Sequence, residues 1–159
     1  MQKYLKIKDK HKNLKFRNAK NKDLLFVLKL HNENVKSKKT FSKNIVKLKE
    51  HKTWFKKKIK DKMLFIFELD EQVGYIRYDY IDRKNLSISI TTKKKYRRKG
   101  LGKKMLDYTL KRKKISKFNI IAYVKNNNIT SKKFFLDSGF RLKKLNTYVL
   151  KKKYEKIYK

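Results

Sequence analysis

Hydrophobic positions in the first third of the chain follow a helical spacing. Apolar residues recur three and four positions apart over Leu24–Leu30, which predicts a helix with Asn21 as its N-cap. Residues 31–41 are polar and predict a loop. A second helix is expected to follow Ser42, which can cap it, and to end near Asp61, with an apolar stripe made of Ile45, Leu48, Phe55 and Ile59.

Segments rich in β-branched and aromatic residues predict strands on either side of these helices. Lys12–Asn18 is a candidate first strand, and three more strands at Met63–Leu69, Gln72–Tyr80 and Leu86–Thr92 follow the second helix. The short polar segments between these last three strands predict tight turns. Strands joined by tight turns pair with their neighbours in an antiparallel sheet.

The helical period returns in the second half of the chain. An apolar stripe predicts a helix that opens at Gly100 and contains Leu101, Met105, Leu106, Thr109 and Leu110. The remaining expected elements are a strand at Phe118–Val124, a helix at Ile129–Asp137 ended by Gly139, and a hairpin of Phe140–Lys144 and Tyr148–Lys153. This order predicts one α/β domain over residues 1–159, with a mixed, mostly antiparallel sheet and helices on both faces.

The composition excludes several classes of protein. The chain has no cysteine, which rules out a disulfide framework, a thiol nucleophile and a cysteine metal site. No apolar run approaches the roughly 20 residues that a membrane helix needs, and the first residues lack the apolar core of a signal peptide. We therefore expect a cytoplasmic protein without a metal centre or a membrane partner.

The charge is strongly positive. Lys and Arg total 49 against 13 Asp and Glu, a net charge of +36, which favours anionic partners, nucleic acids included. The cations are almost all lysines spread along the chain, whereas bidentate recognition of phosphates and bases favours arginine. Lys, Asn, Ile, Tyr and Phe share A/T-rich codons, so genome composition explains much of the bias. Specific nucleic-acid binding is not expected, but the surface attracts small phosphorylated ligands.

The segment from Tyr96 to Lys103 has the features of a phosphate-binding loop. Two of the four glycines of the chain, Gly100 and Gly102, lie here between a predicted strand and a predicted helix. Glycines let a backbone approach a ligand closely, and the N-terminus of a helix presents unpaired N–H groups. Four cations surround this point, namely Arg97, Arg98, Lys99 and Lys103. An ordinary turn with surface lysines is the alternative. The spacing is neither that of the dinucleotide-binding fingerprint nor that of a Walker A loop.

Two motifs resemble the GNAT superfamily of acetyl-CoA-dependent N-acetyltransferases. The family motif Arg/Gln-x-x-Gly-x-Gly/Ala reads here as Arg97-x-x-Gly100-x-Gly102. A second motif, Asn-x-x-Ser/Ala-x-x-x-Tyr-x-x-x-Gly-Phe, reads as Asn128-x-x-Ser131-x-x-x-Phe135-x-x-x-Gly139-Phe140. Both motifs occur in the family order, with a predicted strand between them. The resemblance implies the GNAT acyl-CoA N-acyltransferase fold over residues 12–150.

The N-terminal half resembles one branch of this superfamily more closely. Leu30–Val35, the Glu50-His51-x-x-Trp54-Phe55 segment and Val73–Arg77 look like enzymes that acetylate amino-sugar nucleotides, as in pseudaminic acid synthesis. Related branches acetylate ribosomal proteins and other amines, so a protein N-terminus, a lysine or a small amine is the alternative acceptor. A basic nucleic-acid-binding protein without chemistry is a second alternative, and a member that binds acetyl-CoA without turnover is a third.

The resemblance implies which residues hold acetyl-CoA. Main-chain groups of Ile90 and Thr92 would contact the acetyl-pantetheine arm, and Asn128 and Ser131 would lie along the same path. Asn128 can equally cap the following helix. The pyrophosphate would lie on the loop formed by Arg97, Arg98, Lys99, Gly100, Leu101, Gly102 and Lys103.

The implied reaction is direct attack of an amine on the thioester in a ternary complex. Phe135 stands where the family usually has a tyrosine that protonates the leaving thiolate, so Tyr123 or water would have to serve. Glu68 and Asp79, each near a strand end, are candidates for the base that deprotonates the amine, and a proton relay through water is the alternative. The oligomeric state stays open, with a homodimer as one option.

Three further residues are candidates for acceptor binding. His51 has a suitable ordinary pKa for proton transfer, or it braces the second helix beside Trp54. Trp54 offers an aromatic platform for a sugar or nucleobase, or it packs in the core. Arg77 either pairs with a carboxylate or holds a substrate phosphate.

Overall fold

A computed structural model describes residues 11–152 of the chain. Its seven strands form one sheet in the order β1-β2-β3-β4-β5-β7-β6. The strands are β1 (Lys15–Asn18), β2 (Leu64–Glu68), β3 (Gln72–Tyr80), β4 (Asn85–Thr92), β5 (Asn119–Tyr123), β6 (Arg141–Lys144) and β7 (Thr147–Leu150). The helices are α1 (Leu24–Lys36), α2 (Leu48–Asp61), α3 (Leu101–Leu110), α4 (Lys113–Ser116) and α5 (Ile129–Asp137), with short 3-10 turns at Asn21–Asp23 and Lys94–Tyr96.

Five of the six neighbouring strand pairs are antiparallel, and the predicted β2–β3–β4 meander is confirmed. The exception is the pair of β4 and β5, which run parallel. A parallel pair needs a crossover connection, and α3 with α4 provides it. The mixed, mostly antiparallel sheet expected from the sequence is therefore present.

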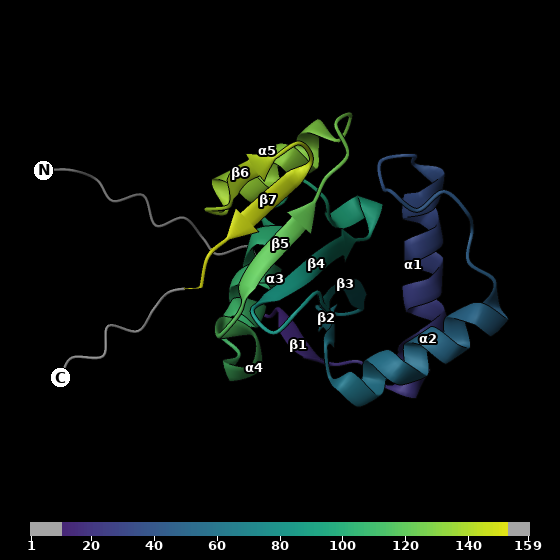
Figure 1. Cartoon of the computed structure of the whole chain (residues 1–159). Coiled ribbons are helices and arrows are strands. Elements are labelled where there is room, and N and C mark those ends of the chain that lie inside the picture. The colour runs from purple at the N-terminus through teal and green to yellow at the C-terminus, as the bar shows by residue number, and fades with distance from the viewer. Residues whose placement is uncertain (1–10, 153–159) are drawn as a thin grey trace, which may run out of the picture.

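Helices cover both faces of the sheet (Figure 1). The larger core lies under α3, α4 and α5, where Ile76 and Tyr78 of β3 meet Met105 and Leu106 of α3. The smaller core lies on the opposite face under α1 and α2, and it contains Val27, Leu30, Phe55, Leu64, Ile66 and Tyr75. Alternation along each strand explains this division, because successive side chains point to opposite faces.

The α1 helix is longer than its apolar stripe predicts. Residues 31–36 were expected in a loop, but they continue the helix to Lys36. Val35 is buried, and the side-chain amide of Asn34 donates to Oγ1 of Thr91 at 3.0 Å. Polar residues therefore extend the inward face of α1, because partners far along the chain satisfy them. The N-cap prediction for Asn21 is wrong, since Asn21 opens a short 3-10 turn before α1.

The α2 helix is shorter than predicted, because it starts at Leu48 rather than after Ser42. The side chain of Asn32 accepts from the backbone N–H of Val46 and donates to its carbonyl oxygen, both at 3.0 Å. This clamp holds the chain outside a helix and leaves Ile45 exposed. The α4 turn was not expected, and its one buried side chain is Ile115. Within residues 11–152, none of the helices combines the length and apolarity that a membrane span requires.

Candidate active site

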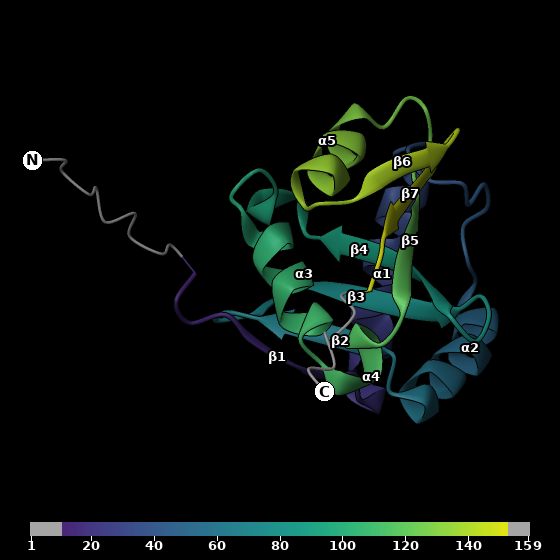
Figure 2. The same ribbon diagram turned by 60° about the vertical axis from the view of Figure 1, so that its left-hand side comes forward.

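The sheet opens between β4 and β5. The two strands pair only over Asn85–Ser87 and Asn119–Ile121, although β4 continues to Thr92 and β5 continues to Tyr123. Figure 2 shows the two strands diverging toward their C-terminal ends. Residues 88–92 of β4 thus have a sheet partner only on the β3 side. Unpaired backbone groups of a strand edge are ready to bind an extended ligand.

A close approach between β3 and β4 flanks this opening. A Cβ atom on Gly74 would lie 2.4 Å from the carbonyl oxygen of Thr91 and 3.1 Å from the Met105 side chain. Real Cβ atoms do not approach a backbone oxygen so closely, so only glycine allows this path of β4 beside α3. Gly74 therefore helps to shape the strand on which Ile90 and Thr92 lie.

The predicted phosphate loop lies where β4 leads into α3. Gly100 is the N-cap of α3 and has a φ of 76°, and Arg98 also has a positive φ of 59°. Within residues 11–152, the backbone N–H groups of Leu101, Gly102 and Lys103 donate no hydrogen bond, as expected for the first turn of a helix. A Cβ on Gly100 would meet no atom within 4 Å. Open space, free amides and helix polarity thus coincide at one point.

The cationic side chains around this loop have different partners. Arg98 is exposed, the ammonium of Lys103 lies 3.3 Å from Asp107, and the carbonyl oxygen of Lys99 accepts from the ring of His11 at 2.7 Å. Glu71 holds the preceding turn, because it accepts from the hydroxyl of Tyr96 at 2.8 Å and pairs with Lys93 and Lys95. These contacts lower the pKa of Glu71 to about 2, and the hydrogen bond from Lys93 has the largest effect. Glu71 is therefore ionised at neutral pH.

Gly102 has a different role from the one that the motif suggests. Its backbone conformation is ordinary for a helix, but a Cβ would lie 3.3 Å from the ring of Phe134 in α5. Gly102 therefore allows α3 and α5 to pack closely, whereas Gly100 supplies the unusual backbone conformation.

Asn128 caps α5, which was one of its two expected roles. Its side-chain oxygen accepts from the backbone N–H of Ser131 at 3.2 Å, and its side-chain amide donates to the carbonyl oxygen of Lys39 at 3.1 Å. Lys125 likewise donates to the carbonyl oxygen of Lys38 at 3.2 Å. These two bonds bring the loop after α1 against the connection between β5 and α5, across the end of the opened sheet.

Arg77, Trp54 and Asp79 come together on the face that α1 and α2 cover. The Arg77 guanidinium lies 5.4 Å from the centre of the Trp54 ring and donates to Oγ of Ser89 at 3.2 Å. Asp79 pairs with Arg77 at 2.8 Å and with Lys58. Arg77 thus pairs with a carboxylate, and through Ser89 it lies directly beside the part of β4 that lacks a β5 partner.

His51, the remaining candidate for acceptor binding, is buried between α2 and the start of α1. His51 is 4% exposed, its ring nitrogen bonds the carbonyl oxygen of Leu24 at 3.1 Å, and its ring lies 5.2 Å from that of Trp54. Burial lowers the pKa of His51, so the ring is neutral at neutral pH. These contacts match the bracing role, the second of the two roles expected for His51, because they join α2 to the start of α1.

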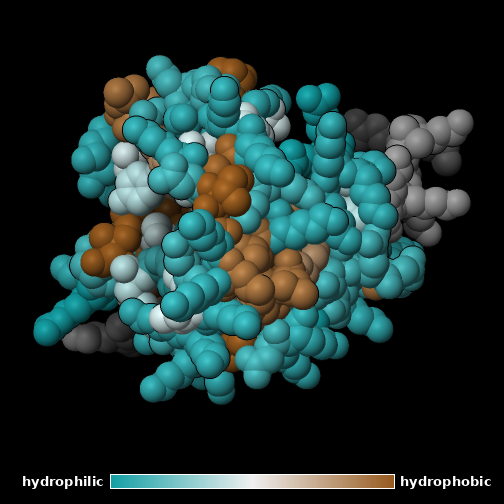
Figure 3. Space-filling view, turned by 90° about the vertical axis from the view of Figure 1, so that its right-hand side faces the viewer, coloured by the Kyte–Doolittle hydropathy of each residue, from teal (hydrophilic) through white to brown (hydrophobic). Residues whose placement is uncertain are grey.

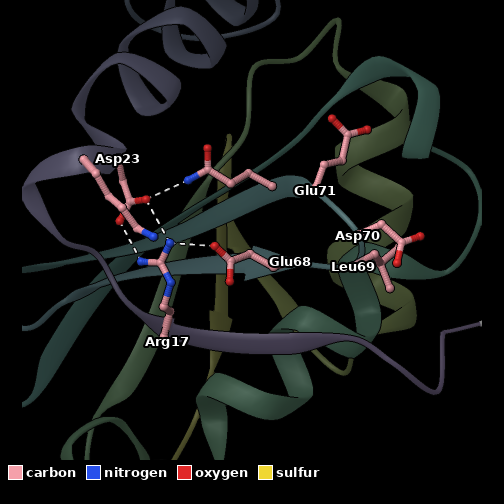
Figure 4. Close-up of a pocket in the computed structure, with 8 residues that line it drawn as sticks. Arg17, Asp23, Glu68, Leu69, Asp70 and Glu71 are labelled. Carbon is pink, nitrogen blue, oxygen red and sulfur yellow. Dashed lines mark hydrogen bonds and ion pairs between the residues drawn. The ribbon is translucent and has the colours of Figure 1, made fainter.

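Glu68 lies on β2, two strands from β4, and the structure does not bring it to the opening. Figure 4 shows its carboxylate facing Arg17 instead. It accepts from the Arg17 guanidinium at 2.6 Å, and the same guanidinium makes two hydrogen bonds to the fully buried Asp23. These residues line a separate cavity of about 390 Å³ that also includes Asp70, Glu71 and Gln72. The role of Glu68 here is to hold β1 against β2.

Tyr123 and Phe135 differ in accessibility. Tyr123 ends β5 at the open side of the sheet and is 51% exposed. Phe135 is buried, and its ring lies 4.9 Å from the ring centre of Phe140 and 5.1 Å from that of Phe134. Of the two rings, only that of Tyr123 carries a hydroxyl at this edge.

Sequence reasoning passed over His31 and Asn34 as site residues. They lie three positions apart on the inward face of α1, in the segment expected as a loop. Asn34 bonds Thr91 and also accepts from Arg97 at 3.1 Å. His31 is half-buried and feels the charge of Arg77. The available signal was their spacing with Val27, Leu30 and Val35, which continues the helical stripe.

Solved structures share this architecture. An N-acetyltransferase from Staphylococcus aureus Mu50 superimposes with a TM-score of 0.77 at 20% identity, over 89% of this chain and 99% of that one. A GNAT superfamily phosphinothricin acetyltransferase from Sinorhizobium meliloti, in complex with AcCoA, gives 0.73 at 17% identity, over 86% of each chain. A ribosomal-protein-alanine N-acetyltransferase from Brucella melitensis gives 0.71 at 21% identity, over 80% and 84% of the chains. At such identities the likeness shows the fold.

The sequence comparison shows the family. No curated protein matches the chain in sequence. The pattern of the acetyltransferase (GNAT) domain, however, matches residues 60–142, which include the strands that open, the glycine loop and α5. The chain therefore belongs to the GNAT acetyltransferase family.

Proposed function

We propose that this enzyme transfers the acetyl group of acetyl-CoA to the primary amine of a nucleotide-linked amino sugar. The observation that carries the coenzyme part is the loss of pairing after Ser87 of β4, next to the free amides at the start of α3. An extended arm that ends in a diphosphate matches both features. Its amide groups fit a strand edge, and its phosphates fit a helix N-terminus with cationic neighbours.

In this assignment the coenzyme lies along residues 88–92 and ends at the loop. Main-chain groups of Ile90 and Thr92 pair with the pantetheine arm, and the amides from Arg98 to Lys103 receive the pyrophosphate. Asn128 and Ser131 border the same path from α5. Asn128 keeps its capping bond to Ser131, and its side-chain amide, which donates one hydrogen to Lys39, has a second hydrogen for the arm. Arg97, Arg98, Lys99 and Lys103 add positive charge around the phosphates.

The reaction is direct attack within the ternary complex. The lone pair of the amine forms a bond to the thioester carbonyl carbon, and the N–H groups of the open strand stabilise the resulting oxyanion. The nitrogen then gives up one proton, the carbon–sulfur bond breaks and the thiolate leaves. The Tyr123 hydroxyl, at the open end of β5, protonates the thiolate.

The acceptor binds on the face that α1 and α2 cover. Trp54 provides an aromatic surface for a sugar or a base, and Arg77 beneath it supplies positive charge for a phosphate. The trio of Arg77, Lys58 and Asp79 keeps a net charge of +1 at this point. An acceptor that carries phosphates is therefore attracted, whereas a purely cationic amine is repelled.

The test is thiol release from acetyl-CoA with a panel of amines. The panel contains a UDP-linked amino sugar, a peptide with an N-terminal alanine, a lysine peptide and phosphinothricin. We expect the UDP-linked amino sugar to give the highest kcat/KM and the acetylated sugar to appear in equal amount with free thiol. A higher kcat/KM for a peptide would replace the acceptor assignment, and no coenzyme binding by calorimetry would overturn the enzyme assignment.

A further inference from the structure

We propose that His31 is the general base that takes the proton from the acceptor amine. This inference rests on the proposed transferase function and names a residue outside both family motifs. Three features carry it. His31 lies on the inward face of α1, its ring nitrogens are unengaged, and the nearby carboxylates are already paired.

Its position comes from the extended α1 helix. His31 lies four residues after Val27, three before Asn34 and four before Val35, so all four side chains lie on the face of α1 that packs on the sheet. Asn34 shows that this face of α1 contacts β4. Its side-chain amide donates to Oγ1 of Thr91, in the part of β4 that lacks a β5 partner. His31 therefore lies one helical turn away from a direct contact with the proposed coenzyme strand.

The ring of His31 is free to act on a ligand. Among residues 11–152 it makes no hydrogen bond and no ion pair, although it is half-buried between α1 and the sheet. His51, the other histidine of this region, has its ring nitrogen committed to the carbonyl oxygen of Leu24. A free nitrogen in a partly buried position is what proton abstraction from a bound amine needs.

The carboxylates that could compete are occupied. Asp79 is held by Lys58 and Arg77, and Glu68 is held by Arg17 two strands away. The side chains of the open β4 segment that face α1 and α2 are Ser89 and Thr91, and neither is a base at neutral pH. No carboxylate is thus left to receive the proton at this part of the described structure.

The surroundings keep the His31 ring neutral. Burial, and then the positive charge of Arg77 on β3, lower the pKa of His31 below its ordinary value. His51 on α2 also faces this region, and β3 adds the buried phenol of Tyr75, which stays neutral because burial raises its pKa. Strand β4 adds only hydroxyl groups. At neutral pH the imidazole therefore carries a lone pair and can accept a proton.

The step balances as follows. A ring nitrogen of His31 takes one proton from the acceptor ammonium, and the freed lone pair forms the new bond to the carbonyl carbon of the acetyl group. The carbon–sulfur bond breaks, and its electron pair leaves with the sulfur of coenzyme A. After the bond forms, the nitrogen still carries two hydrogens, and it gives up the second proton as the carbonyl re-forms. The thiolate takes a proton from Tyr123 or water, the second proton of the nitrogen replaces it there, and the imidazolium releases its proton to solvent.

The experiment compares the wild type with His31→Gln and His31→Ala. The probe is the amine of the panel above that the wild type uses best, and kcat/KM is measured from pH 5 to pH 9. We expect kcat/KM to fall by about 100-fold in both variants, with the acetyl-CoA affinity unchanged, because general base catalysis contributes roughly 10²–10⁴-fold. The acid limb of the wild-type profile, which reports protonation of the base, disappears. Added imidazole restores part of the rate of His31→Ala.

His51→Gln is the matched control, because it removes the neighbouring buried imidazole. This change is expected to lower the melting temperature and to leave the acid limb in place. Retention of both the rate and the acid limb in His31→Gln would overturn the proposal for His31 while leaving the transferase assignment intact. Failure of the wild type with every amine, despite bound acetyl-CoA, would instead overturn the proposed function and this inference with it.

Discussion

The Arg97 side chain joins helix α1 to the end of strand β4. Its Nη2 donates to Oδ1 of Asn34 at 3.1 Å, and its Nε donates to the carbonyl oxygen of Thr92 at 3.1 Å. Asn34 in turn donates to Thr91. Four residues thus connect the helix beside the acceptor, the strand that would hold pantetheine and the first position of the glycine loop.

This connection predicts a coupling between α1 and coenzyme binding. Asn34→Ala removes the bonds to Arg97 and Thr91, each worth about 1 kcal/mol. We expect acetyl-CoA to bind about 3- to 10-fold more weakly, measured by isothermal titration calorimetry. Glu33→Ala, an exposed neighbour on the same helix, is the control and should bind normally. Equal affinities of the two variants would show that the bonds do not position the coenzyme strand.

Gly74 should be intolerant of any side chain. In Gly74→Ala the new Cβ meets the Thr91 carbonyl oxygen at 2.4 Å, so β4 has to move. Such overpacking costs about 1–3 kcal/mol, and we expect urea unfolding to show this loss together with a weaker affinity for acetyl-CoA. A variant that keeps the wild-type unfolding midpoint and affinity would contradict the close approach of β3 and β4.

The two glycines of the loop should respond differently to alanine. Gly102→Ala places a Cβ 3.3 Å from Phe134, so the cost is steric, and the double variant Gly102→Ala/Phe134→Leu should recover much of the lost stability. Gly100→Ala meets no atom, but its φ of 76° is costly for alanine by about 1–2 kcal/mol. Phe134→Leu should not rescue this second variant. Thermal unfolding of the wild type, the two glycine variants, their two double variants and Phe134→Leu alone measures both effects.

The buried Asp23 should be essential for stability. Burial opposes its ionisation, but two hydrogen bonds from Arg17 and one from the backbone N–H of Lys20 outweigh it and lower the pKa of Asp23. Asp23→Ala leaves the Arg17 guanidinium without this partner and should cost about 3 kcal/mol of unfolding free energy. Lys22→Ala, an exposed neighbour, should cost far less. Equal unfolding midpoints would refute the role of the pair.

Stability should also fall in mild acid because of the two histidines under α1 and α2. Burial lowers the pKa of both His31 and His51 in the folded state, so the unfolded chain binds more protons once the pH falls below their ordinary value of about 6.5. The unfolding free energy should therefore decrease from pH 7 toward pH 5, and the decrease should be smaller in His31→Gln/His51→Gln. A pH dependence that is identical in the double variant would show that other groups cause it.

Much of the fold was predictable because its elements have strong local patterns. Strands β2, β3 and β4 alternate or are uniformly apolar, and helix α3 has four buried residues at helical spacing. The predicted bounds failed where distant contacts override the local pattern. Residues 31–36 are polar apart from Val35, yet they are helical, because β4 and the glycine loop provide hydrogen-bond partners for Asn34. Val46 stays outside α2, because Asn32 binds its backbone.

The distribution of charged and apolar residues over the surface was also not predictable from local sequence (Figure 3). Figure 3 views the side of α1 and α2, where lysine-rich surface surrounds apolar patches, and the exposed large apolar residues of these helices and their connection are Leu25, Phe41, Ile45 and Leu48. Composition predicts the positive charge but not where the few carboxylates gather. Four of them, Asp23, Glu68, Asp70 and Glu71, line one cavity at the edge of the sheet.

By itself, the sequence determined the order of the strands and of the longer helices, the glycine loop before α3 and the family. Those features depend on periodicity and on motifs of nearby residues, which do not require knowledge of distant contacts. Only the tertiary structure decided that the sheet opens after Ser87, that Gly102 serves packing against Phe134, and that the carboxylates of Glu68 and Asp79 are engaged while His31 is free. Each of these depends on which atoms of separate segments meet, and local sequence does not encode that.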